Sequence, residues 1–73
     1  MALIEVRSEI TGNVLLVLVG VGEIVEEFQD MLILESMKME IPITSPTKGA
    51  VVSIATVGEV LQQGSVVAVI ESE

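Results

Sequence analysis

Six consecutive residues in the middle of the sequence have side chains that could do chemistry: Glu35-Ser36-Met37-Lys38-Met39-Glu40. The amine of a lysine is a nucleophile once it has lost its proton, so Lys38 is the candidate reactive group. The methionines beside it have unbranched, adaptable side chains that suit a contact surface for a partner. Lys38 is therefore the candidate site, and the surrounding elements must position it.

The sequence around the lysine predicts a tight hairpin whose turn breaks two local rules. Runs rich in Ile and Leu on both sides, Met31–Leu34 and Ile41–Ile43, are typical of strands. A two-residue turn at Met37-Lys38 needs positive φ and would prefer Asn-Gly. The same register places Glu35 opposite Glu40, and like charges in such a pair reduce stability. Local rules that fail at one point, between strands that obey them, indicate a functional site.

The composition excludes several classes of function. The 73 residues contain neither cysteine nor histidine, which removes disulfides, thiolate metal sites and the commonest catalytic base. We therefore predict no catalytic residues, no metal site and no enzymatic activity of its own. A net charge of −8, with three basic residues, argues against a nucleic-acid partner. Hydrophobic residues make up 51% of the chain and Phe28 is the single aromatic one, which favours strands with aliphatic side chains.

Neither a membrane span nor a secretory signal is predicted. The longest apolar run, Val14–Val19, is far too short to cross a bilayer. The N-terminal stretch, Met1–Arg7, lacks the charged, apolar and small-residue order of a signal peptide. We therefore expect a cytoplasmic protein with no membrane partner.

The second half of the chain repeats the first. Gly22–Glu27 aligns with Gly58–Gln63, and Met31–Ser36 aligns with Val67–Ser72, both at an offset of 36. Further upstream the offset is 37, so one residue is missing from the second half. Each half is too short to bury a core alone, so we predict that both interlock in a single domain, residues 1–73.

Each half is predicted to contain four short strands separated by turns that contain Gly or Pro. The predicted strands are Ile4–Val6, Asn13–Val19, Ile24–Val25, Met31–Glu35, Ile41–Ile43, Ala50–Ala55, Val60–Leu61 and Val66–Glu71. The predicted fold is all-β, a flattened antiparallel β-barrel or sandwich of two four-stranded sheets with internal pseudo-twofold symmetry. This symmetry predicts the lysine hairpin at one pole of the domain and both chain ends at the other.

The hairpin motif closely resembles the Glu-Ala-Met-Lys-Met signature of biotinyl domains, the biotin carboxyl carrier family, and the resemblance covers almost the whole chain. It implies that Lys38 carries biotin in amide linkage and that a biotin protein ligase attaches it. A carboxyl group would then travel between biotin carboxylase and carboxyltransferase partners, as in acetyl-CoA or acyl-CoA carboxylases. The short segment from Gly12 to Gly22 resembles the compact carriers that lack a thumb insertion.

The same resemblance implies roles for the neighbours of the lysine. Met37 and Met39 would contact the carboxylase sites, and Glu35 and Glu40 would serve ligase recognition. Alternatively, the methionines fill gaps in the core and the glutamates keep the hairpin soluble. Lys48, which lies in the turn before Gly49, is assigned no role. A lipoyl carrier of a 2-oxo-acid dehydrogenase complex and an unmodified binding module remain alternative functions.

Three further expectations concern the scaffold. Phe28 stands where the repeat places the counterpart of Gly64, so we predict a reshaped turn there. The glycines, Gly12 and Gly49 included, are predicted to be turn residues. Side chains alternate along a strand, so one alternate trio of Val14–Val19 should form an exposed apolar stripe that docks on a partner, unless the N-terminal segment covers it.

Overall fold

The computed structural model of the protein describes residues 1–72, which form eight β-strands. In chain order the strands are β1 (Ala2–Arg7), β2 (Gly12–Val17), β3 (Ile24–Val25), β4 (Asp30–Ser36), β5 (Met39–Thr44), β6 (Gly49–Ile54), β7 (Val60–Leu61) and β8 (Val66–Ser72). Each predicted strand corresponds to an observed one, and the ends differ by at most two residues.

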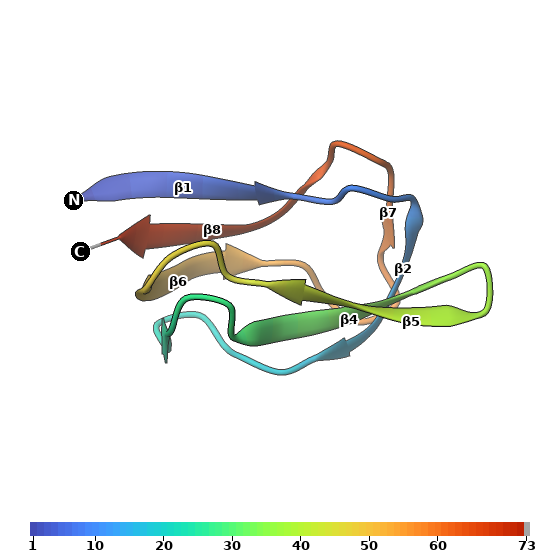
Figure 1. The fold of residues 1–73 in the computed structure, drawn as a ribbon, viewed down its shortest axis with the longest axis horizontal. Helices are drawn as coiled ribbons and strands as arrows, with labels where there is room; N and C mark the ends of the chain where they lie inside the picture. The colour runs from blue at the N-terminus through green and yellow to red at the C-terminus, as the bar shows by residue number, and fades with distance from the viewer. Residues whose placement is uncertain (73) are drawn as a thin grey trace.

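The strands form two four-stranded antiparallel sheets that pack against each other (Figure 1). The first, called here the β1 sheet, has the order β1-β8-β6-β3. The second, called here the β5 sheet, has the order β5-β4-β2-β7. The predicted fold class, all-β with two four-stranded sheets, is confirmed.

The two sheets are built alike, because β1 to β4 occupy the same places in one half as β5 to β8 in the other. Val14 N donates a hydrogen bond to Glu59 O at 2.9 Å, and its counterpart Val51 N donates to Glu23 O at 2.9 Å. A β-bulge follows each of these two valines. The repeat in the sequence therefore reappears as repeated backbone geometry.

Inward-facing aliphatic side chains from both sheets form one core between them. The buried members are Val6, Val14, Val19, Val25, Met31, Leu32, Leu34, Val51, Leu61, Val67, Ala68 and Ile70. Burial of such side chains is the main favourable term in folding, and it fixes the strands against each other. The core therefore provides a firm base for the hairpin between β4 and β5.

The β4–β5 hairpin and the chain ends lie at opposite poles of the molecule. Figure 1 shows the hairpin tip projecting from one end, and the start of β1 beside the end of β8 at the other. The molecule is elongated, with extents of 36 × 20 × 18 Å. The arrangement predicted from the repeat is confirmed.

The longest apolar run does not keep one register along its length. A bulge between Val14 and Leu16 shifts its pairing with β4, and β2 ends at Val17 instead of the predicted Val19. Val14 and Val19 are consequently both buried, whereas Leu16 and Leu18 are each 50% exposed. Neither predicted trio faces outward as a unit. The N-terminal segment does not cover the two leucines, because β1 pairs with β8 in the other sheet.

The turn at Phe28 keeps the shape of the turn at Gly64, so the predicted reshaping is wrong. Phe28 has a φ of 68° and Gly64 a φ of 88°. Phe28 N donates to Ser45 O at 2.7 Å, and Gly64 N donates to Ser8 O at 2.7 Å. The surrounding hydrogen bonds hold the phenylalanine in a backbone conformation that favours glycine, with its side chain 73% exposed.

Gly12 and Gly49 are strand residues, and their prediction as turn residues is wrong. They are the first residues of β2 and β6. A Cβ on Gly12 would lie 2.7 Å from the carbonyl oxygen of Glu35, and one on Gly49 would meet the carbonyl oxygen of Glu71 even more closely. Glycine is required at both positions because two backbones approach each other there.

Candidate functional site

The tip of the β4–β5 hairpin is a two-residue turn formed by Met37 and Lys38. Their φ angles are 52° and 65°, so both residues adopt the left-handed conformation of a type I′ turn. This turn matches the twist of the flanking strands, although neither residue is the Asn or Gly that usually occupies it. The pairing of β4 with β5 imposes this turn. The turn then fixes the direction in which the Lys38 side chain points.

Strand pairing below the tip confirms the predicted register. Ser36 pairs with Met39, and Glu35 pairs with Glu40. Both glutamates are exposed and lie directly opposite each other, an arrangement that opposes pairing of the strands. The hairpin thus retains a repulsive pair immediately beside the reactive residue.

The base of the hairpin is fixed to the start of β2. The buried Ser36 hydroxyl donates a hydrogen bond to Thr11 O at 2.8 Å. Gly12 lies so close to Glu35 O that no larger residue fits without movement. The role of Thr11 and Gly12 in holding the base of the hairpin was not predicted from the sequence. The alignment of Gly12 with Gly49 in the repeat could have indicated that glycine is required at this position.

The Lys38 amine is held by no ion pair within residues 1–72. The two cations that do form ion pairs are Arg7, with Glu5 at 2.7 Å, and Lys48, with Glu26 at 3.9 Å. Lys38 itself is exposed at the tip. Its amine can therefore be approached from solvent without first breaking a contact with this domain.

The two methionines that flank the lysine lie at the surface. The exposed fraction of Met37 is 84% and that of Met39 is 55%. Met31, by contrast, is completely buried in the core. The alternative in which Met37 and Met39 fill the core is therefore wrong, and the pair forms an adaptable apolar surface around the amine.

The hairpin offers a nucleophile at its tip and exposed contact surfaces beside it. Among residues 1–72, no three side chains of the types that bind metals come together. No helix within this part of the chain is long and apolar enough to cross a membrane. The geometry leaves the amine at the tip open to chemical modification.

Comparisons with known proteins agree with this geometry. The family model described as "Biotin-requiring enzyme" matches residues 4–70. The biotinylated protein TB7.3 homolog of Mycobacterium leprae is 42% identical over 67 residues, which cover 90% of this chain and 94% of that protein.

Two much larger proteins contain a similar segment. Urea amidolyase of Saccharomyces cerevisiae is 37% identical over 68 residues, which are 92% of this chain and 4% of that protein. The crystal structure of Kluyveromyces lactis urea carboxylase matches with a TM-score of 0.90 and 30% identity, covering 97% of this chain and 6% of that one. Because the family model spans most of the sequence and the fold agrees, the chain belongs to the biotin/lipoyl attachment family.

Proposed function

We propose that the protein is a biotin carrier and that biotin is attached through an amide bond to the Nζ atom of Lys38. The observation that carries this proposal is the preformed hairpin tip, where the lysine stands exposed between two exposed methionines. The Mycobacterium leprae relative, which the chain covers almost completely, is described as biotinylated. Residues at the tip therefore have the chemistry and the access that attachment needs.

Attachment makes the domain a substrate of a biotin protein ligase. The Lys38 amine attacks the carbonyl carbon of biotinyl adenylate, an amide bond forms, and AMP leaves with the electrons of the broken C–O bond. Exposed lysine amines are mostly protonated at neutral pH, so the ligase must accept a proton. Within residues 1–72 no carboxylate forms an ion pair with the Lys38 amine. The fixed turn contributes orientation, which reduces the entropy that is lost when the amine meets the adenylate.

The same scaffold suits transport between two enzyme sites. Attached biotin supplies a ring nitrogen that accepts a carboxyl group and later releases it. The lysine lies at one pole of the domain and both chain ends lie at the other. The lysine side chain with its attached biotin can therefore move between enzyme sites, while a linker at a chain end would hold the domain to its partner. Tethering raises the effective concentration of the carried group at each site. We propose a biotin carboxylase and a carboxyltransferase as the partners, in an acetyl-CoA or other acyl-CoA carboxylase.

Neighbouring side chains divide between two partners in this proposal. Met37 and Met39 present the adaptable surface that contacts the carboxylase sites. Glu35 and Glu40 present a negative patch to the ligase, and their mutual repulsion would fall when a cation of the ligase lies between them. Glu35 and Glu40 therefore act in attachment, and the methionines act in carboxyl transfer.

Labelling by a purified biotin ligase tests the proposal. With ATP and biotin, the parent protein should gain one biotinyl group by intact mass, and Lys38→Arg should gain none. Lys48→Arg is the matched control and should be labelled at the parental rate. Label on Lys48, or an unlabelled parent that a lipoyl ligase does modify, would contradict the proposal.

A further inference from the structure

The four edge strands of the two sheets are protected to different degrees. β3 and β7 contain only two residues each, so they offer little backbone for pairing. β5 is six residues long and carries Pro42, a residue that blocks strand addition because it lacks an N–H. β1 is equally long and has Glu5 at the equivalent position. β1 is thus a long edge strand without proline.

The hydrogen bonds show which backbone groups of β1 point outward. Ser8 N donates to Ser65 O at 2.9 Å, and Ser8 O accepts from Gly64 N at 2.7 Å, so Ser8 faces β8. Successive residues of a strand direct these groups to opposite sides. Leu3, Glu5 and Arg7 therefore direct their N–H and C=O groups away from β8, towards the open side of the sheet.

The equivalent groups of β5 follow the same rule. Ser45 N donates to Gln29 O at 2.9 Å, so Ser45 faces the β4 side. Pro42 and Thr44 consequently direct their backbone towards the open side of the β5 sheet. Pro42 cannot donate a hydrogen bond there, which leaves a gap in the row of donors at its centre.

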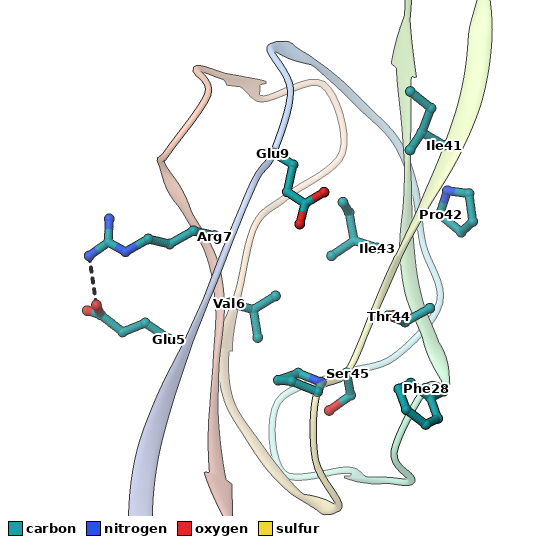
Figure 2. Close-up of a pocket in the computed structure, with 11 residues that line it drawn as sticks. Glu5, Val6, Arg7, Glu9, Phe28, Ile41, Pro42, Ile43, Thr44 and Ser45 are labelled. Atoms are coloured by element: carbon teal, nitrogen blue, oxygen red, sulfur yellow. Dashed lines mark hydrogen bonds and ion pairs between the residues drawn. The ribbon is translucent and has the colours of Figure 1, made fainter.

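A partly apolar groove of about 440 Å³ lies between these two edge strands. In Figure 2, Val6 and Glu9 on one side and Ile43 on the other point into the space between β1 and β5. Glu5 and Arg7 point away from it and pair with each other. Phe28 lines the same groove near one end, and its exposed ring stands in the strained turn.

From these features we infer that β1 is a strand-addition site for an extended segment of a partner protein, with alternating apolar and basic side chains. The added strand pairs with the outward backbone groups of Leu3, Glu5 and Arg7. Because side chains alternate across a sheet, one set then enters the groove over Val6 and Ile43. Backbone pairing supplies affinity, and the groove supplies selectivity for apolar side chains.

Charge and packing select this occupant over a second copy of the chain. The domain has a net charge of −8, so basic side chains are favoured on the face of the added segment that points away from the groove. A second β1 would bring its own Val6, which is only 9% exposed and already packed in its own core. The Val6 side chain of the second copy could therefore not fill the groove of the first. Two copies would also repel each other, because both carry a net negative charge.

A synthetic peptide, acetyl-(Val-Lys)₃-amide, tests the inference with the intact protein. Added peptide should bind saturably, shift the amide NMR signals of Leu3, Glu5 and Arg7, and slow their hydrogen exchange. The same peptide methylated on the alternate backbone nitrogens that face β1 should lose binding, and methylation of the other set should preserve it. These peptide controls leave the protein unchanged, so folding of a variant cannot confuse them.

Two protein variants separate the backbone from the side chain at position 5. Glu5→Pro copies the proline of β5 and should weaken binding by about tenfold or more, since it removes a donor and places a ring on the edge. Glu5→Gln keeps the N–H and should stay within about threefold of the parent, because an exposed ion pair contributes little. Signal shifts on β5 or around Leu16 instead of β1, equal effects of both methylated peptides, or no saturable binding would overturn the inference.

Discussion

The lysine hairpin and the paired chain ends occupy equivalent places in the two halves of the molecule. The pair Glu35–Glu40 at the hairpin corresponds to the pair Glu71–Leu3 at the chain ends, and each pair joins one residue from each half. The backbones pair in the same way at both places. The hairpin pole closes with a strained turn and a like-charge pair, whereas the pole with the chain ends is open. The duplication therefore gives both poles the same strand pairing. The proposed chemistry lies at the hairpin pole, where the sequence differs from that of its counterpart.

Other equivalent positions also differ between the halves, and three of them lie on turns or strand edges or beside a bulge. Phe28 replaces a glycine, Pro42 replaces Glu5 on the edge strand, and Leu16 replaces Ser53 after the bulge. Each replacement lies at the surface, where the core does not decide the residue. The interior requires similar residues in both halves, and the surface is free to specialise. Substitutions at equivalent positions can test this contrast directly.

The largest effect is expected at the two glycines where backbones approach. Gly49→Ala should lower the free energy of unfolding by about 3 kcal/mol, and Gly12→Ala by about 1 to 2 kcal/mol, because the added methyl group overlaps a neighbouring backbone in both cases and more severely at Gly49. Urea unfolding measures both values.

The two glycine variants should also differ in labelling. Gly12→Ala disturbs the contact with Glu35, so folded Gly12→Ala protein should accept biotin more slowly than folded Gly49→Ala protein. Equal stability losses, or equal labelling rates, would mean that Gly12 has no particular connection with the hairpin.

The next effect concerns the two turns with positive φ. Phe28→Gly should raise the free energy of unfolding by about 1 kcal/mol, because it relieves the left-handed conformation of a residue whose side chain is mostly exposed. Gly64→Ala should lower it by about 1 kcal/mol for the opposite reason. Thermal unfolding by circular dichroism measures both, and a destabilised Phe28→Gly variant would reveal a stabilising contact of the ring.

A reciprocal exchange tests the charge pair below the tip. Glu40→Leu, which copies the Leu3–Glu71 pair, should raise the free energy of unfolding by about 0.5 kcal/mol. Leu3→Glu creates a like-charge pair at the other pole and should lower it by about the same 0.5 kcal/mol. Both differences should shrink at 1 M salt, where exposed charges are screened. Differences that do not respond to salt would point to packing instead of charge.

The smallest effect on stability is expected at the methionines of the tip. Met37→Leu and Met39→Leu should change the free energy of unfolding by under about 0.5 kcal/mol, because both side chains are exposed. Both variants should accept biotin normally and transfer carboxyl groups more slowly in a reconstituted carboxylase. Normal transfer by both would remove the methionines from the proposed mechanism.

Much of the fold was predicted from the sequence because its signals are local or repeated. Alternating aliphatic runs, turn residues and the 36-residue repeat located the eight strands and both poles. The hairpin register was also predicted, since two strands joined by two residues can pair in few ways. Glu35 opposite Glu40 and positive φ at Met37 and Lys38 followed from that register.

The features that were predicted wrongly depend on contacts between distant segments. The bulge after Val14 arises from pairing with β4, so the sequence of β2 alone could not show that Leu16 and Leu18 face outward. Phe28 keeps a glycine-like turn because Ser45, seventeen positions away, accepts its N–H. Local preference at such positions is worth about 1 kcal/mol, which the surrounding pairing can override.

The division between sequence and structure has a physical basis. Periodicity and turn chemistry act over a few residues, so the strands, the duplication and the hairpin with its lysine could be predicted from the sequence. The contact of Gly12 with Glu35 and the groove between β1 and β5 became visible only in the folded protein. Both contacts depend on how the two sheets pack. Packing brings together residues that are far apart in the sequence and that follow no regular spacing.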